Sequence, residues 1–226
     1  MKKVKLSLVI ATLSCLSINT FAADNLADMF KDGKIKGELK AYYFDRDTKT
    51  GDQVEILSTG VLLNYETASF KGFKIGTLFQ SSASPFASAD AKTEYKSDMM
   101  ASGSQLSNAY LSYTLAKTTL KIGRQYIKSP LVRSSSSRLV AQAFEGETLT
   151  TKILPKTEIL LMHVSKYQNR TDGESGIGQF EKIGDDGAYS AMIKFKGVPN
   201  TVLRAQYLDV KDDYEISEIM NKTSPS

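Results

Sequence analysis

Cationic side chains are the residues of this sequence whose types and spacing could most readily do chemistry. Some lie in or beside a serine-rich stretch, residues 128–142, and others stand at alternate positions of apolar segments. Lysine and arginine placed at intervals along a water-filled wall select anionic or carboxylate-bearing solutes. The predicted solute-binding residues are Arg124, Arg133, Arg138, Lys40, Lys74 and Lys121. The alternative for each of them is a solvated charge that serves only solubility.

Groups that catalyse reactions are sparse. His163 is the only histidine, so a Ser-His-Asp triad or a histidine metal site would have to use it. No Gly-x-Ser-x-Gly or His-Glu-x-x-His pattern surrounds it. The acidic segment 45–52 resembles a damaged calcium loop, because Lys49 stands where an oxygen ligand belongs. We therefore predict no enzyme activity, no cofactor and no metal site, and we assign His163 to a wall.

The cations must be positioned by β-strands, because apolar and polar residues alternate with a period of two through most of the chain. In the segment 106–115, Leu111 and Tyr113 share one face, whereas Asn108 and Ser112 share the other. The predicted strands, about nine in number, cover residues 34–45, 55–66, 70–81, 106–115, 119–123, 144–153, 157–167, 188–196 and 201–210.

The connections between these strands are alternately long and short. That alternation is typical of an antiparallel up-and-down transmembrane β-barrel, an all-β fold with long extracellular loops and short periplasmic turns. A soluble sandwich gives no reason for it. The segment 128–142 is predicted to fold into the lumen, where Arg138 meets the solute. The side chains predicted to face lipid are Leu111, Tyr113, Leu120, Ile122, Ile193 and Phe195.

Residues 1–22 have the features of a secretory signal peptide, since three lysines precede a short apolar core. The only cysteine, Cys15, lies inside this segment, so the mature chain 23–226 has no disulfide scaffold and no cysteine metal site. Removing the three lysines lowers the formal net charge from +4 to +1, and a nucleic-acid partner is not implied. A lipoprotein acylated at Cys15 is the alternative.

One part of the chain also resembles a known family. The residues that carry the resemblance are a Gly-Arg-Gln near a strand end, a Pro-Leu, an arginine and a Phe-Glu-Gly, at positions 123–125, 130–131, 138 and 144–146. In this order and spacing they resemble the OprD-type outer-membrane porins, and the similarity covers most of residues 30–214. The resemblance implies passive diffusion of small carboxylates and amino acids through a narrow, basic-lined pore in the outer membrane. Arg124 and Arg138 match the family pattern best, although Arg124 needs a bulge after Ile122 to turn inward.

We predict that residues 23–226 form only the N-terminal part of a porin barrel. Single-chain bacterial barrels have even numbers of strands, and the resemblance implies about eighteen, twice the number here. We expect an open half-barrel whose first and ninth strands do not pair, followed by a tail without a strand. The implied partners are outer-membrane lipid and small anionic or zwitterionic solutes, with homo-oligomer formation left open. A β-rich surface adhesin and a small outer-membrane barrel enzyme are the alternatives, and conductance across a planar bilayer would separate them from a porin.

Overall fold

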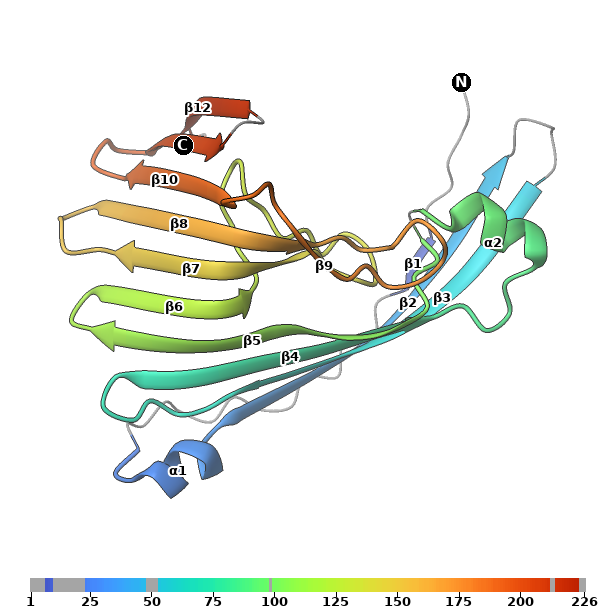
Figure 1. Ribbon diagram of the computed structural model, residues 1–226, viewed down its shortest axis with the longest axis horizontal. Helices are drawn as coiled ribbons and strands as arrows, with labels where there is room; N and C mark the ends of the chain where they lie inside the picture. Colours follow the sequence, from blue (N-terminus) through green and yellow to red (C-terminus); the bar gives the residue numbers. More distant parts are fainter. Residues whose placement is uncertain (1–6, 10–22, 48–52, 98, 212–213, 224–226) are drawn as a thin grey trace.

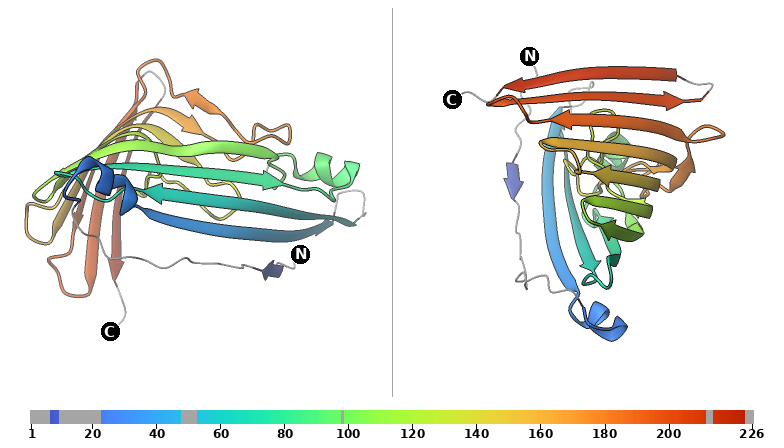
Figure 2. Two further views of the ribbon diagram at one scale, coloured as in Figure 1. Left: turned by 90° about the horizontal axis from the view of Figure 1, so that it is seen from below. Right: turned by 90° about the vertical axis from the view of Figure 1, so that its left-hand side faces the viewer.

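Nearly every strand pairs with its neighbour in the chain, and these pairs build one curved antiparallel sheet (Figures 1 and 2). This computed structural model describes residues 7–9, 23–47, 53–97, 99–211 and 214–223. Two short helices, α1 (Leu26–Lys31) and α2 (Ala89–Tyr95), lie near opposite ends of the strands. The strands are β1 (Ser7–Val9), β2 (Lys34–Asp47), β3 (Gln53–Glu66), β4 (Phe73–Ala83), β5 (Gly103–Leu115), β6 (Thr118–Gln125), β7 (Ala143–Thr151), β8 (Thr157–Gln168), β9 (Phe180–Lys182), β10 (Ala188–Phe195), β11 (Thr201–Val210) and β12 (Tyr214–Thr223).

The sheet is open. Its strands follow chain order from β1 to β12, except that the short β9 leaves this path and pairs only with β8. The strands predicted from alternation correspond to β2–β8, β10 and β11. Among the described strands, β2 and β11 do not pair with each other, so the expected unclosed barrel wall is confirmed.

Four elements are absent from the sequence predictions: β1, inside the predicted signal peptide, β9, inside a predicted long connection, β12 and α2. The segment expected to be a tail forms β12, which pairs with β11 along its whole length. Ile216 and Ile219 are separated by three positions, which hides the strand from a search for a period of two, but the backbone groups of β11 offer a full ladder of partners. Helix α2 lies within the long polar connection predicted between residues 82 and 104, where Ser88 caps its first turn.

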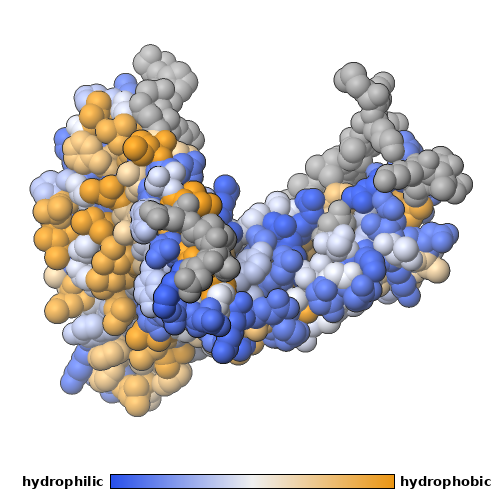
Figure 3. All heavy atoms as spheres, turned by 45° about the horizontal axis from the view of Figure 1, so that its top comes forward, coloured by the Kyte–Doolittle hydropathy of each residue, from blue (hydrophilic) through white to orange (hydrophobic). Residues whose placement is uncertain are grey.

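Each strand turns one set of side chains to the convex face and the other to the concave face. The lipid-facing side chains predicted from alternation share the convex face, since Leu111 lies directly opposite Ile122 and Tyr113 opposite Leu120. They are exposed or half-exposed, for example 46% for Leu111 and for Ile193. Figure 3 shows apolar side chains gathered over the strand wall, while hydrophilic side chains cover the part that extends toward α2.

The two ends of the strands differ in the length of their connections. At one end, tight turns place single residues in the left-handed region, including Ala116 (φ 53°), Lys156 (φ 56°) and Asn200 (φ 53°). At the other end, the segments 84–102, 126–142 and 169–187 form long loops. We call these the short-turn end and the long-loop end.

The two helices pack against the sheet, one at each end of the strands. Helix α1 covers the turn between β3 and β4, where the Ala68 amide donates to the Met29 carbonyl (2.9 Å). Helix α2 packs on the concave side of β3, where the buried Tyr95 hydroxyl donates to the Val54 carbonyl (2.9 Å). Neither helix, nor any other in the described part of the chain, is long and apolar enough to cross a membrane.

Candidate functional site

A loop that folds against the concave face is the centre of the site. We call residues 126–142 the constriction loop. Gln80, on β4, is fully buried and holds one side of this loop. Its side-chain amide donates to the Ala141 carbonyl (2.9 Å) and accepts from the Ala141 amide (3.0 Å). The prediction that the loop folds inward is therefore confirmed.

A second buried glutamine holds the other side of the loop. Gln206, on β11, accepts a hydrogen bond from the Leu131 amide (3.0 Å) and donates one to the Ser129 hydroxyl (3.0 Å). It also donates to the Ser190 hydroxyl on β10 (2.8 Å). Gln80 and Gln206 thus attach one loop to two different stretches of the wall, so its place depends on both.

Within the loop, a tight hairpin brings two cations together. Lys128 and Arg133 pair as an isolated antiparallel bridge, and the Ser129 amide donates to the Val132 carbonyl between them (2.9 Å). Both cations are exposed, whereas Val132 is buried against the apolar cluster that includes Phe144. The hairpin therefore places two positively charged side chains above this apolar cluster.

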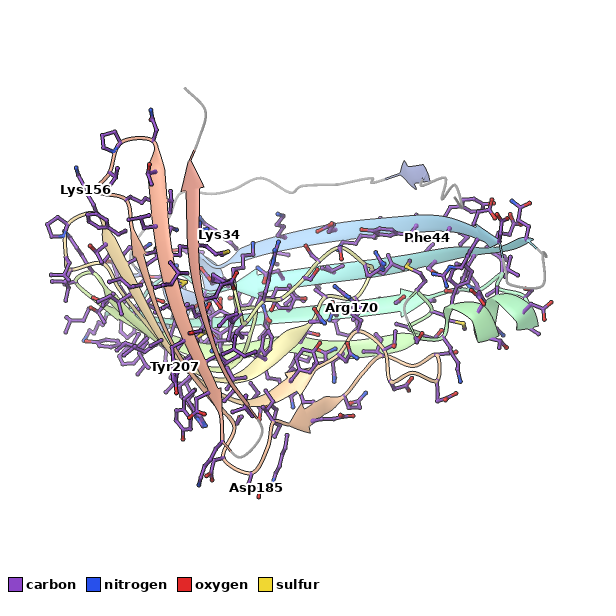
Figure 4. The ribbon with its side chains drawn as sticks, turned by 90° about the horizontal axis from the view of Figure 1, so that it is seen from above. Lys34, Phe44, Lys156, Arg170, Asp185 and Tyr207 are labelled. Atoms are coloured by element: carbon purple, nitrogen blue, oxygen red, sulfur yellow. The ribbon has the colours of Figure 1, made fainter. Side chains whose placement is uncertain are left out.

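Arg138 lies farther along the loop, beside β2. Its guanidinium carbon is 5.8 Å from the centre of the Phe44 ring, which is a cation–π contact. Figure 4 labels Phe44 and Arg170. Arg170 lies on the other side, where it donates to the Ser137 hydroxyl (3.3 Å). Burial, followed by the positive charge of Arg138, lowers the pKa of the Arg170 guanidinium from its ordinary value. The sequence analysis missed Arg170, because it lies in a glycine-rich loop without periodicity.

Hydrogen bonds hold the loop that carries Arg170 in place. The Asp172 carboxylate accepts from the backbone amides of Glu174 (2.7 Å) and Gly176 (2.9 Å), and these bonds lower the pKa of Asp172. The Ser102 amide donates to the Ser175 carbonyl (2.7 Å), which joins this loop to the start of β5. We call residues 169–179 the brace loop.

Of the predicted lysines, Lys40 lies deepest on the concave wall. Its side chain is buried, with Nζ 3.7 Å from a Glu38 carboxylate oxygen. Lys40 and Lys36 line a cavity of about 530 Å³ between β2, β3 and the constriction loop, and Lys128 lines it from the loop side. The Lys40 side chain therefore faces the concave side, where it lines this cavity.

Lys74 and Lys121 also face inward, but both are engaged with other side chains. Lys74 Nζ lies 3.0 Å from a Glu66 carboxylate oxygen, and the Tyr110 hydroxyl donates to the other oxygen (2.8 Å). Lys121 Nζ lies 4.1 Å from the centre of the Tyr110 ring. The Glu66 carboxylate therefore offsets one of these two positive charges near the short-turn end.

Arg124 lies on the opposite face from the other predicted cations, which corrects the expectation that it turns inward. It stands directly opposite Ala109, and the pairing of β5 with β6 runs without a bulge. Its side chain therefore shares the convex face with Ile122. There its Nε lies 2.9 Å from a Glu145 carboxylate oxygen, and its guanidinium carbon is 4.3 Å from the centre of the Phe180 ring.

Two further cations on the concave face are not among the predicted solute-binding residues. Lys194 and Arg204 stand directly opposite each other on β10 and β11. They line a cavity of about 540 Å³ together with Lys128 and Arg133 from the constriction loop. A signal for them exists in the sequence, because Lys194 lies between Ile193 and Phe195, which face outward.

The cavities share cationic lining residues. Lys128 lines both the cavity beside β2 and the cavity beside β10, and so lies between them. Lys194 lines the second of these and also a third cavity of about 310 Å³ at the short-turn end. The other cations of the third cavity are Lys117, Lys152, Lys156 and Lys196. A cationic surface therefore follows the concave side from the constriction loop to the short-turn end.

Comparison with known proteins gives a consistent picture. The family described as outer membrane porin, OprD family, matches residues 89–215. Acinetobacter baumannii OccAB3 is similar with a TM-score of 0.73 and 17% identity, over 86% of this chain and 54% of that chain. Pseudomonas aeruginosa OccK9 (OpdG) gives 0.70 and 14%, over 88% and 55%. P. aeruginosa OpdK, solved with vanillate, gives 0.68 and 17%, over 88% and 54%. None of the curated proteins matches the chain.

The chain spans about half the length of these solved structures. Their low identities make them a comparison of folds, and the fold agrees with an antiparallel barrel wall that is not closed. The family match rests on sequence and covers more than half of the 226 residues. This protein therefore belongs to the OprD family of outer-membrane porins.

Proposed function

We propose that the chain forms the wall and the constriction of a channel through which small anionic solutes diffuse passively across the outer membrane. Carboxylates and amino acids are the proposed solutes. OpdK, a structural neighbour, was solved with vanillate. The proposed solute would meet Arg138 and Arg170 first, and then pass along the cationic cavities toward the short-turn end.

The observation that carries this proposal is the position of the constriction loop. Gln80 and Gln206 hold it on the concave face, where a solute would have to pass it. Arg138 and Arg170 stand beside its exposed Ser137. Positively charged side chains at a narrow point favour anions over cations, and passive diffusion needs no catalytic group.

A conductance experiment tests the proposal. The full chain is folded into planar bilayers, and the permeability ratio of chloride to potassium is measured from the reversal potential in a salt gradient. We expect a ratio above one that falls in Arg138→Gln and in Arg170→Gln. Arg124→Gln removes the same charge from the convex face and should leave the ratio unchanged. Equal ratios in all conducting variants would refute the proposed function.

A further inference from the structure

We propose that the cavity beside β10 binds a phosphate dianion, either as inorganic phosphate or as the phosphate group of a small ester. We call Lys128, Arg133, Lys194 and Arg204 the phosphate site. The inference rests on the proposed function, because it names a solute class for that lumen. The two proposals differ in the charge of the solute. A phosphate dianion carries two negative charges on one group, whereas a carboxylate carries one.

The register of the wall puts two of the four cations side by side. Glu158, Lys194, Arg204 and Met220 form one row across β8, β10, β11 and β12, each directly opposite the next. Residues directly opposite in antiparallel strands have Cβ atoms about 5 Å apart, and like charges there destabilise the pair. An anion bound between Lys194 and Arg204 would turn that repulsion into attraction.

The constriction loop supplies the other two cations from above this row. Lys128 and Arg133 are neighbours across the loop hairpin, and both line the same cavity. The hairpin is tied to β11 by the bond from Gln206 to Ser129 (3.0 Å). The backbone positions that carry the four cations are therefore set before any ligand arrives, which lowers the entropic cost of binding.

The charges of the cavity do not balance. Among the described residues that line it, Glu158 is the only carboxylate. That carboxylate lies closer to Lys152 (3.2 Å), which lines only the neighbouring cavity, than to Lys194 (3.9 Å). Within the described part of the chain, no carboxylate forms an ion pair with the remaining three cations of the site. A monoanion would leave most of this positive charge uncompensated, whereas a dianion would offset more of it.

Hydroxyl groups complete a donor set suited to phosphate. Residues 134–137 are all serine, and all four line the cavity. The Ser134 hydroxyl accepts from the Ile127 amide (3.0 Å), which leaves its hydrogen available to donate. Phosphate presents more acceptor oxygens than a carboxylate, and a guanidinium such as that of Arg204 binds two of them at once.

Calorimetric titration of the detergent-folded full chain tests the site. The ligands are inorganic phosphate, glycerol phosphate and acetate at about pH 8, where a phosphate group carries close to two charges. We expect phosphate to bind at least about tenfold more tightly than acetate. The double variant Lys194→Gln/Arg204→Gln should weaken phosphate binding by about tenfold or more. Lys92→Gln/Lys182→Gln removes the same charge from exposed positions and should change the affinity by less than about twofold.

The outcomes distinguish failure of the phosphate site from failure of the proposed channel function. Phosphate binding that the wall variant abolishes supports the site even if Arg138→Gln and Arg170→Gln leave the permeability ratio unchanged, in which case only the proposed function fails. Equal affinity for acetate and phosphate, or equal losses in the wall and control variants, overturns the site even in a conducting chain. If the wall variant does not fold, Arg133→Gln in the exposed hairpin gives the same test. If inorganic phosphate binds more tightly than glycerol phosphate, the site takes free phosphate; if glycerol phosphate binds more tightly, the site takes a phosphate ester.

Discussion

Gln80 and Gln206 show how single amide side chains decide where a loop lies. Each is almost fully buried on the concave wall, and each both donates to and accepts from the constriction loop. A buried amide that satisfies backbone groups on another segment specifies one position, because any displacement leaves those groups unpaired. A charged side chain in the same place would have to be desolvated at greater cost.

Gln206→Leu should therefore destabilise the fold and release the loop hairpin. The substitution leaves the Leu131 amide and the Ser129 hydroxyl without this partner, at a cost of about 1–3 kcal/mol in the free energy of unfolding. Urea unfolding gives the free energy, and hydrogen exchange at Leu131 reports the loop. Gln105→Leu, which removes a more exposed amide pair with Gln179, is the control and should cost much less. Unchanged exchange at Leu131 would contradict the role of Gln206.

The brace loop should loosen in acid. Because the amides of Glu174 and Gly176 lower the pKa of Asp172, its folded value lies below the unfolded value of about 3.9. The stabilisation is present above the unfolded pKa and is lost as the pH falls through the folded pKa. Proteolysis within residues 169–179 measures this, with an acid-active protease at low pH and a neutral protease at neutral pH. Asp172→Ala should make the loop sensitive at neutral pH already, and resistance in that variant would contradict the argument.

At the scale of elements, most of the strands could be predicted from the sequence, whereas the assembled site could not. Alternation identifies β2–β8, β10 and β11, because a face toward lipid and a face toward the lumen impose a period of two. Alternation also places Arg124 on the same face as Ile122, and the structure follows this simple pattern rather than the bulge that the family resemblance favoured. Bulges do occur, but beside Ser107 and Ser165, where no sequence signal announces them.

An added charge should lower the free energy of unfolding more on the convex face than on the concave face. Ile193→Arg places a guanidinium among exposed apolar side chains, and at mid-membrane depth this costs about 2–4 kcal/mol. Thr150→Arg places the same group on the concave side of β7, where water can solvate it, and should cost under about 1 kcal/mol. Urea unfolding in lipid vesicles compares the two. Equal costs would mean that the convex face of these strands does not contact hydrocarbon.

At the scale of the whole molecule, the distribution of charge matters more than its sum. A predicted mature charge of only +1 conceals a concave surface with three cavities that are all lined by lysine, one of them also by arginine. Those cavities combine residues from β2, β10, β11 and the constriction loop, so no local segment of sequence reveals them. Arg133 and Lys40 were found because each lies in a recognisable pattern, whereas Arg204 acquires its neighbours only in the folded sheet.

The proposed anion preference should weaken as salt concentration rises. Charges on a wetted wall are screened over about 10 Å at 0.1 M salt but over about 3 Å at 1 M. We expect the chloride-to-potassium permeability ratio of the folded chain to fall toward one across that range. Arg138→Gln should give a flatter dependence, because fewer fixed charges remain to be screened. A ratio independent of salt would indicate that pore size, rather than this charge, determines passage.

The two attachments of the constriction loop also set an order of assembly. The loop is bonded to a glutamine 61 residues before Ala141 and to another 75 residues after Leu131. Contacts between such distant segments form late, because the intervening chain must first lose its conformational freedom. We expect the hairpins between sequential strands to form first, while the concave side of the sheet is still uncovered. The narrowing of that passage is then the last step of folding, and it reports that β4 and β11 have both reached their final places.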